Sequence, residues 1–466
     1  MMKGRFLVVL GTLIVALLAC EKEELHTPAT DNEVNQWIER TLRDHYLWYD
    51  DMPAEGAVDR GSAPEEFFLS LLSDQDGKEQ AEGHHYFSTL QRAATKSITD
   101  ENDSYGFDFA IGTLQDNDGT HKIALVLYVL KDSPAERAGL RRGDWIVGVN
   151  GSYGTLQDYD QLRSGGSATF QLAESVEGSA TSLRLGREIA IEPSTVVEDI
   201  PILKDSIYQV GTRRVGYLMY NHFELGPDEN DLDDTRYQQQ LEELFARFKQ
   251  AGVNEFVLDL RYNGGGNVLC AQALASFLAP EAALGETFCL MEYNDKHTDK
   301  NNAMPLLRTT EILAGNLDLD RLFVLTGSTT ASSSELVINT LIPYLGRQNV
   351  RLIGRQTFGK TVGATVYNES ERYGWILSPI TFRIYNRDHE ADYADGFAPD
   401  VSINEFAYPL APLGDPRDPL LGYALAEISG IASPALRATS PSSGPDIRYE
   451  PPRSLRDNVL VIHDNK

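Results

Sequence analysis

Cysteine and basic residues are scarce in this sequence. Its 466 residues include three cysteines, Cys20, Cys270 and Cys289, which is too few for a fold that depends on a disulfide framework. Cys270 and Cys289 could pair or could remain free thiols. The 41 basic residues are outnumbered by 69 acidic ones, and the formal net charge is -28. Because such a chain repels nucleic acid, we do not expect it to bind DNA or RNA.

Metal-binding and nucleotide-binding motifs are also missing. His84 and His85 are adjacent, so they lack the spacing that places two ligands on one face of a helix, and no carboxylate–histidine motif surrounds them. The glycines at 264–266 follow a strand-like run, but they lack both the G-x-G-x-x-G pattern and a following Lys-Ser/Thr pair. We therefore expect neither a metal ion nor an organic cofactor.

An apolar run near the amino terminus is too short to span a membrane. It covers residues 6–18, follows Lys3 and Arg5, and leads through Leu-Leu-Ala into Cys20, whereas a spanning helix needs roughly 20 apolar residues. The arrangement resembles a bacterial lipobox, which implies that residues 1–19 are removed as a signal peptide and that Cys20 is lipidated. Residues 20–30 would then tether the protein in the cell envelope, on the outer membrane facing the periplasm or the cell surface. A plain signal peptide or an uncleaved anchor is the alternative.

Residues 31–100 predict an N-terminal helical domain. Asp31 could cap an amphipathic helix whose apolar residues recur at three-to-four spacing, and a second helix is expected near residues 64–72. From residue 101 the pattern changes to short β-like runs separated by glycine-rich turns, which predict a β-rich domain.

The β-rich segment, residues 101–195, resembles a PDZ domain. The resemblance is carried by Ser-Pro-Ala-Glu-Arg-Ala-Gly-Leu-Arg-Arg-Gly-Asp-Trp-Ile at 133–146 and by Val-Asn-Gly at 149–151. It implies a loop that captures a peptide carboxylate while the peptide adds as a strand to the sheet edge. Three residues match that loop: Tyr105, Gly106 and Phe107. An ordinary strand start is the alternative for them.

Three segments far apart in the sequence each follow an apolar, strand-like run. Residues 258–266, Leu-Asp-Leu-Arg-Tyr-Asn-Gly-Gly-Gly, can expose backbone N–H groups to an oxyanion. Residues 326–335 place Ser332 at the start of a predicted helix, where unpaired N–H groups favour developing negative charge. Residues 356–360 end in a lysine that could act as a base. Ser332 and Glu335 also fit a helix capping box, and that segment alone favours the capping role.

Lys360 can act as a base only when it is neutral, so the site would have to lower its pKa by removing water. Apolar neighbours such as Phe358 could provide that burial. Nearby carboxylates would keep the lysine charged, and we therefore expect acidic residues to be distant from it. His222, which follows the strand-like run at 215–220, is an alternative base.

Together the three segments resemble the carboxyl-terminal processing, or tail-specific, serine protease family. Its strings L-D-L-R-x-N-x-G-G, x-A-S-x-S-E and T-F-G-K occur in that order, and residues 396–401 resemble its closing G-x-x-P-D-V. The resemblance covers most of the mature chain. It implies a multidomain α/β protein with an N-terminal helical region, a β-rich PDZ domain, a ClpP/crotonase-like α/β protease core at 196–430 and a Pro/Ser-rich tail at 431–466.

Carried over by position, the resemblance makes Ser332 the nucleophile and Lys360 the general base, with the N–H groups of Gly265 and Ser333 as the oxyanion hole. The family commonly has a glutamine four residues after the lysine to orient it, but Ala364 occupies that position. The implied activity is that of a serine endopeptidase that processes exported polypeptides near their free carboxyl ends without a cofactor. The alternative is a catalytically weak or inactive lipoprotein whose PDZ segment binds peptides or apolar ligands.

Overall fold

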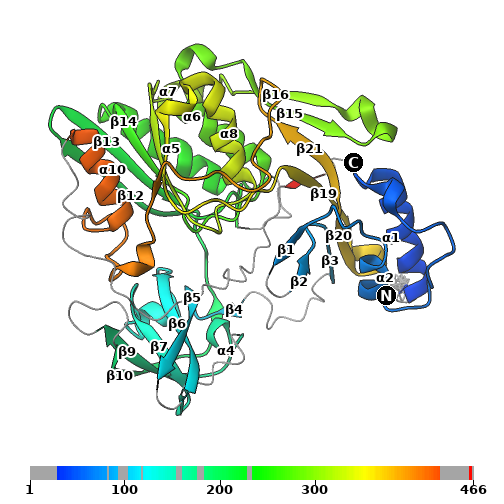
Figure 1. The fold of residues 1–466 in the computed structure, drawn as a ribbon, viewed down its shortest axis with the longest axis horizontal. Coiled ribbons are helices and arrows are strands. Elements are labelled where there is room, and N and C mark those ends of the chain that lie inside the picture. The colour runs from blue at the N-terminus through cyan, green and yellow to red at the C-terminus, as the bar shows by residue number, and fades with distance from the viewer. Residues whose placement is uncertain are drawn as a thin grey trace, which may run out of the picture.

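The computed structural model arranges the chain as an N-terminal region, a PDZ segment and a large α/β core (Figure 1). It describes residues 29–80, 83–92, 103–116, 119–153, 160–175, 183–227, 233–430 and 461–463. The predicted signal peptide, Cys20 and nearly all of the predicted tail lie outside these residues. Within the described ranges, no helix combines the length and apolar character needed to cross a membrane.

The N-terminal region begins with helices and ends in strands. Thr30, rather than Asp31, caps the first helix, because its side chain and that of Glu33 form a capping box. The elements are α1 (Asp31–His45), η1 (Tyr49–Asp51), α2 (Pro64–Leu69), β1 (Lys78–Gln80), β2 (Gly83–His85) and β3 (Thr89–Arg92). Strand β3 pairs with a strand of the core. The predicted helical region is therefore present at residues 31–69, and after it the chain forms strands, of which β3 completes a core sheet.

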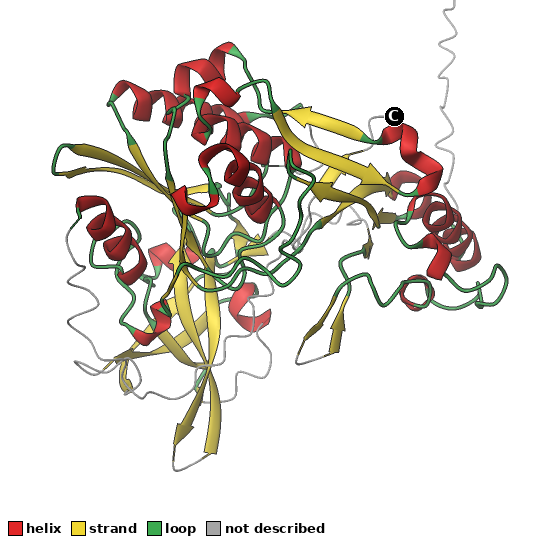
Figure 2. Cartoon of the chain, turned by 45° about the horizontal axis from the view of Figure 1, so that its top comes forward, coloured by secondary structure: helices red, strands yellow, loops and turns green. Residues whose placement is uncertain are grey.

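The PDZ segment is built mainly from strands, as Figure 2 shows. Its sheet has the order β10-β9-β7-β6-β5, with β8 paired to β7. The elements are β4 (Asp103–Ser104), β5 (Phe107–Asp116), β6 (Gly119–Val129), α3 (Pro134–Arg137), β7 (Trp145–Val149), β8 (Ser152–Tyr153), α4 (Asp160–Arg163), β9 (Ala168–Ser175), β10 (Leu183–Ile191) and β11 (Thr195–Val196). Among the described strands, β5 pairs with β6 alone, so it forms one edge of the sheet.

The core contains a six-stranded sheet whose order is β12-β13-β14-β17-β18-β22. All neighbouring pairs from β13 onwards are parallel. The strands are β12 (Ile202–Val210), β13 (Arg213–Tyr220), β14 (Glu255–Asp259), β17 (Leu322–Thr326), β18 (Val350–Gly354) and β22 (Val401–Ser402). Because parallel strands end at the same edge, the loops after β14, β17 and β18 meet there. These loops carry the three segments singled out in the sequence.

Helices cover both faces of this sheet. Along β17, Leu322 and Val324 face the apolar cluster formed with α5, α6 and α8, while Phe323 and Leu325 face α10. The helical elements associated with this sheet are α5 (Arg236–Gln250), α6 (Val268–Leu278), η2 (Glu281–Ala283), α7 (Thr310–Gly315), α8 (Ser333–Leu345), η4 (Arg347–Asn349), η5 (Glu405–Ala407) and α10 (Pro419–Ser429). Burial on both faces explains why these strands are continuous apolar runs.

A second sheet, not expected from the sequence, joins the core to the N-terminal region. Its order is β16-β15-β21-β19-β20-β3, and β23 pairs with β19. The elements are β15 (Thr287–Tyr293), η3 (Asp295–Lys300), β16 (Asn302–Pro305), β19 (Val362–Glu369), α9 (Ser370–Tyr373), β20 (Trp375–Ser378), β21 (Ile380–Tyr385) and β23 (Val461–His463). Strand β19 starts directly after the loop that carries Lys360, so this sheet positions the lysine.

Cys270 on α6 and Cys289 on β15 are buried free thiols. Burial raises the pKa of both, so they are poor nucleophiles.

Candidate active site

Ser332 lies in the turn between β17 and α8 in an unusual backbone conformation. Its φ is 61° and its ψ is -117°, whereas the residue that caps a helix normally has an extended backbone. The residue is fully buried, and within the described part of the chain its Oγ has no hydrogen-bond partner. A strained backbone and an unpaired buried hydroxyl are both costly, and such features are typical of functional sites.

Glu335 connects the serine turn to the lysine loop. Its Oε2 atom accepts hydrogen bonds from the backbone N–H groups of Ser332 at 3.0 Å and Lys360 at 2.8 Å. Its Oε1 atom accepts from the Thr357 hydroxyl and the Gly359 N–H, each at 2.6 Å. Because both N–H groups donate to the same oxygen atom, the backbone nitrogens of Ser332 and Lys360 can be no further apart than the two hydrogen-bond lengths added together. The same carboxyl group of Glu335 therefore caps helix α8 and holds the lysine loop beside the serine turn.

This carboxyl group contradicts the expectation that acidic residues would be distant from Lys360. Glu335 is fully buried, and desolvation raises its pKa to about 7 although four hydrogen bonds act in the opposite direction. Its oxygens bind backbone N–H groups and a hydroxyl, so the carboxyl is used to shape the loop. The expectation failed because the sequence presents Glu335 only as a local helix cap.

Lys360 is buried, with 2% of its surface exposed. Its Nζ lies 4.9 Å from the centre of the Phe87 ring, and Phe87 also packs near Phe358, with 6.0 Å between ring centres. The N-terminal region thus supplies an aromatic wall beside the lysine, in addition to the expected Phe358. The hydroxyl of Ser332 and the amine of Lys360 are not hydrogen-bonded in this state, because Ser332 Oγ has no hydrogen-bond partner among the residues that the structure describes.

Two further contacts fix the lysine loop. The backbone N–H of Phe358 donates to the Thr330 carbonyl at 2.9 Å, which joins the loop to the serine turn. From the N-terminal region, Lys78 Nζ donates to the Phe358 carbonyl at 2.5 Å. Desolvation lowers the pKa of Lys78 even though Glu335 and Asp395 act to raise it. No pattern in the sequence connected Lys78 or Phe87 with the site, since both reach it through tertiary packing.

The glycine loop packs directly on the serine. A Cβ atom at Gly265, whose φ is 113°, would lie 2.6 Å from the Ser332 Cβ, so only glycine fits this close approach. The N–H of Gly265 donates to the Asn263 side chain at 2.8 Å. In this state it is therefore not available as the predicted oxyanion donor, because the side chain that shapes the turn already binds it. Ser333, the other predicted donor, is the first residue of α8. Its hydroxyl donates to the Gly266 carbonyl at 2.7 Å.

A buried ion network holds the start of the glycine loop. The guanidinium group of Arg261 donates to Asp259, Glu405 and Asp418 at 2.8 to 3.1 Å. Burial acts to raise the pKa of Asp418, but Arg261 and Arg142 outweigh it, and the pKa lies below its usual value. The arginine of the L-D-L-R string is thus structural, because it anchors the loop to the segment from η5 to α10.

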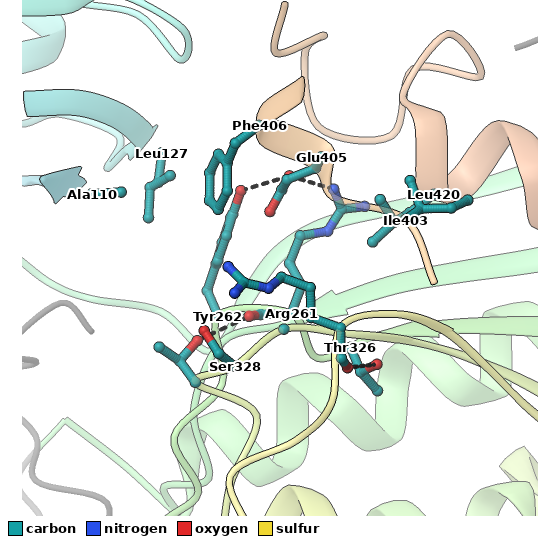
Figure 3. A pocket seen from close by; sticks show the side chains of 13 residues that line it. Ala110, Leu127, Arg261, Tyr262, Thr326, Ser328, Ile403, Glu405, Phe406 and Leu420 are labelled. Atoms are coloured by element: carbon teal, nitrogen blue, oxygen red, sulfur yellow. Dashed lines mark hydrogen bonds and ion pairs between the residues drawn. The ribbon is translucent and has the colours of Figure 1, made fainter. Parts of the chain in front are cut away.

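Arg142 brings the PDZ segment into the same network. It donates to the hydroxyl of Tyr262 at 2.7 Å and to Glu405 at 3.0 Å. A pocket at this junction lies between PDZ side chains such as Ala110 and Leu127 and core side chains such as Arg261, as Figure 3 shows. The PDZ segment is therefore in direct contact with the loop that packs on Ser332.

The predicted peptide-binding loop of the PDZ segment is closed in this structure. The N–H of Tyr105 donates to the Arg163 carbonyl at 2.8 Å, and the Tyr105 hydroxyl donates to the Gly166 carbonyl at 2.5 Å. The N–H of Gly106 donates to the Ser104 hydroxyl at 2.9 Å. These N–H groups are not available to a carboxylate here, which differs from the prediction. Phe107 starts the edge strand β5, so the edge itself remains in place for an added strand.

Two other positions singled out in the sequence do not join the serine. His222 lies in the loop after β13, with its Nε2 atom 4.0 Å from Glu224 and its ring 6.4 Å from that of Tyr237, and it does not hydrogen-bond to Ser332 Oγ. Ala364 lies on β19 within an apolar cluster. The side chain at that position is therefore apolar, and the ring of Phe87 lies beside the Lys360 amine.

Known proteins share this architecture. The profile described as peptidase family S41 matches residues 214–403, that of the peptidase S41 N-terminal domain matches residues 33–89, and that of the PDZ domain matches residues 125–164. A solved structure from Bacteroides fragilis NCTC 9343, described as an S41 protease, is 36% identical in sequence with a TM-score of 0.74. The alignment covers 85% of this chain and 97% of that one.

Curated relatives are more distant. Proteins named probable CtpA-like serine protease are 24% identical over 328 residues in Staphylococcus aureus and 24% identical over 284 residues in Staphylococcus epidermidis. The alignments cover 69% and 60% of this chain. The chain spans 58% and 50% of the length of these two relatives.

Proposed function

Because this chain belongs to peptidase family S41, we propose that it is a serine endopeptidase in which Ser332 is the nucleophile and Lys360 is the general base. The single observation that supports this most strongly is the state of Ser332. Its hydroxyl is buried, has no hydrogen-bond partner in the described part of the chain and lies in a strained turn at the start of α8. One carboxyl group links its backbone to that of Lys360. A purely structural helix cap needs neither the strain nor the link.

The geometry supports the following steps. The neutral amine of Lys360 accepts the proton of the Ser332 hydroxyl as Oγ attacks the carbonyl carbon of the scissile peptide bond. The negative oxygen that forms is stabilised by the N–H of Ser333 and by the N-terminus of α8. The lysine then gives its proton to the leaving amine, which leaves an acyl group on Ser332. A water molecule, deprotonated by the same lysine, releases the acid product and restores the hydroxyl.

One movement is needed before this sequence can begin. In this state Ser332 Oγ has no hydrogen-bond partner within the described ranges, so a side-chain rotation must bring the hydroxyl to the lysine amine. Catalytic hydrogen bonds are often long or absent before substrate binds. We propose that the second oxyanion donor is likewise formed on binding, by a shift that frees the N–H of Gly265 from Asn263.

Covalent labelling tests the nucleophile and base. A fluorophosphonate should label the protein on Ser332, and Ser332→Ala should abolish labelling. Lys360→Ala should slow labelling by roughly 10²-fold or more, because it removes the general base. The control is Ser334→Ala, on the same helix turn, whose hydroxyl donates to the Asn263 carbonyl. Labelling that survives Ser332→Ala would contradict the proposal and would favour the binding-protein alternative.

The carboxyl-end preference is proposed from the PDZ segment. Its edge strand β5 can accept an extended peptide by strand addition, and its core contacts reach the glycine loop through Arg142. The test compares cleavage of one peptide with a free carboxyl terminus and with an amidated one. We expect faster cleavage of the free acid, and equal rates would contradict the preference.

The membrane location is proposed from the sequence alone, since Cys20 lies outside the described residues. Lipidation would hold the mature enzyme on the envelope through its acyl chains. Mass spectrometry of the purified native protein should find an acylated Cys20 as the first residue. Cys20→Ser should move the protein from the membrane fraction to the soluble fraction of the envelope, and unchanged fractionation would contradict the anchor.

A further inference from the structure

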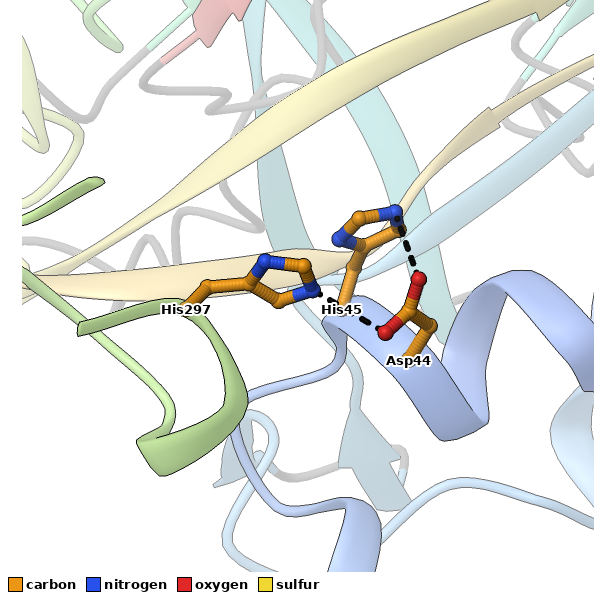
Figure 4. A group of neighbouring side chains, drawn as sticks. All are labelled: Asp44, His45 and His297. Atoms are coloured by element: carbon orange, nitrogen blue, oxygen red, sulfur yellow. Dashed lines mark hydrogen bonds and ion pairs between the residues drawn. The ribbon is translucent and has the colours of Figure 1, made fainter. Parts of the chain in front are cut away.

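A histidine–aspartate cluster joins the N-terminal region to the core, away from Ser332. Asp44 and His45 end helix α1, and His297 lies in η3, between β15 and β16. Figure 4 shows the three side chains turned toward one another. The Nε2 atom of His297 lies 3.1 Å from Asp44 Oδ1, and that of His45 lies 3.4 Å from Asp44 Oδ2. All three ligand atoms lie within 4.8 Å of one another.

The spacing suits one transition-metal ion. Around a tetrahedral Zn²⁺ with bonds of about 2.0 to 2.1 Å, neighbouring ligand atoms are separated by about 3.4 Å. The two histidine–carboxylate distances, one to each oxygen of Asp44, are close to that value, and a small rotation of the carboxylate would direct one oxygen at the ion. Two imidazoles and one carboxylate form a common zinc ligand set, and water can supply a fourth ligand. The histidine side chains are 20% and 17% exposed, so an ion can reach them from solvent.

The surroundings bring the two ligand-bearing segments together. The ring of His45 stacks with that of His297 at 4.4 Å and with that of Tyr367 on β19 at 5.1 Å. Asn294, at the start of η3, donates to the carbonyl groups of Asp44 and Tyr46, each at 3.0 Å. The backbones of α1 and η3 are therefore already joined, and binding requires only side-chain rotation. One ring must turn out of the stack so that both nitrogens point at the same ion.

Two cationic side chains near the cluster, Lys296 and Arg43, would weaken its attraction for a metal ion, but both interact with groups outside the cluster. Lys296 Nζ donates to the Arg43 carbonyl at 2.6 Å and lies 3.3 Å from the centre of the Tyr49 ring. Arg43 pairs with Glu39 at 2.8 Å. Since these groups have partners that do not belong to the cluster, the carboxylate of Asp44 stays directed at the two histidines.

From this geometry we infer that Asp44, His45 and His297 form a site for a divalent transition metal of the Zn²⁺ class that clamps the N-terminal region to the core. The clamp is structural and lies outside the proposed catalytic chemistry. It acts on the region that supplies Lys78 and Phe87 to the lysine loop, because Tyr46, next to His45, donates to Asp76, and Asp76 accepts the N–H of Phe87. The inference does not depend on the proposed peptidase activity.

Calorimetric titration of the full, tag-free mature protein with Zn²⁺ tests the site. We expect one ion per chain with micromolar or tighter affinity, and a loss of at least tenfold in His297→Gln and in Asp44→Asn. The matched control is His389→Gln, which removes a surface histidine that lies 2.7 Å from Glu292 and should leave the affinity unchanged. Ca²⁺, which prefers oxygen ligands, should give no binding at this site.

A second readout separates a metal site from a simple hydrogen-bonded cluster. Bound Co²⁺ should give the intense visible absorption of a tetrahedral site, and Zn²⁺ should raise the melting temperature of the wild type but not of His297→Gln. Circular dichroism establishes whether each variant is folded. If His297→Gln does not fold, Asp44→Asn, at an exposed position, serves as the second variant. Absence of binding at millimolar Zn²⁺, or the same Zn²⁺ affinity in the folded variants as in the wild type, would overturn the inference. The three side chains would then form only a hydrogen-bonded Asp–His cluster.

Discussion

At the scale of single residues, the close approach of Gly265 to Ser332 gives a sharp prediction. Gly265→Ala places a methyl group where only 2.6 Å is available and forces alanine into a φ of 113°. We expect the serine turn to be displaced and kcat/KM to fall by about 10²-fold or more, because small misplacements at a reacting centre are costly. Peptide hydrolysis and fluorophosphonate labelling rates measure the loss.

The control for Gly265→Ala is Gly374→Ala. Gly374 also has a positive φ, 74°, but a Cβ there meets no atom within 4 Å. The Gly374→Ala substitution should lower the free energy of unfolding by about 1 kcal/mol through backbone strain and leave kcat/KM unchanged. If both variants lost activity equally, strain rather than the contact with Ser332 would be responsible.

The raised pKa of Glu335 predicts a pH dependence of stability. Its folded-state pKa of about 7 lies above the ordinary value of 4.5, so between these pH values the folded protein holds a proton that the unfolded chain has released. The free energy of unfolding should therefore fall as the pH rises from 5 to 7. Glu335→Gln should remove this slope and should also destabilise the protein by about 1 to 3 kcal/mol, because an amide NH₂ cannot accept the loop N–H groups.

Urea unfolding of wild type and Glu335→Gln at several pH values measures both effects. Glu311→Gln is the control, since Glu311 lies in the first turn of α7 and its pKa is lowered by hydrogen bonds to the backbone and to Thr309. Its titration falls below the tested window, so the wild-type slope should persist. An unchanged slope in Glu335→Gln would show that another group carries the pH dependence.

At the scale of elements, strand β1 supports the lysine loop from outside the core. Lys78→Met keeps the length of the side chain but removes the hydrogen bond from Nζ to the Phe358 carbonyl. We expect kcat to fall several-fold with little change in KM, because the loop that carries Lys360 is less well placed. The matched control, Lys249→Met, removes a similar bond to the Leu313 carbonyl far from the site and should leave both constants unchanged. A rise in KM alone would contradict the positioning role.

At the scale of the whole molecule, Arg142 holds the PDZ segment on the core. Its side chain is 7% exposed and pairs with Glu405, so Arg142→Met leaves part of a buried ion network uncompensated. We expect destabilisation of about 3 to 5 kcal/mol and faster proteolysis between the PDZ segment and the core. Arg137→Met breaks the exposed pair with Glu192 and should cost about 0 to 1 kcal/mol. Equal costs would show that the network is not buried in solution.

The sequence predicted those parts of the molecule that depend on local pattern. The buried parallel strands, the helices between them and the PDZ strands follow from apolar runs and turns, and the strings around Gly265, Ser332 and Lys360 indicated the family. The second sheet escaped prediction because β3 and β20 come from distant segments and pair only in the folded chain. Glu335, Phe87 and Lys78 were missed for the same reason, since their roles depend on partners far away in sequence.

The sheet that follows Lys360 draws strands from distant parts of the described chain, β3 before the PDZ segment and β23 at residues 461–463. During synthesis, the turn that bears Ser332 can emerge and fold long before β23 is available to pair with β19. Until β23 has been made, a nascent polypeptide therefore carries Ser332 in a core whose second sheet is incomplete.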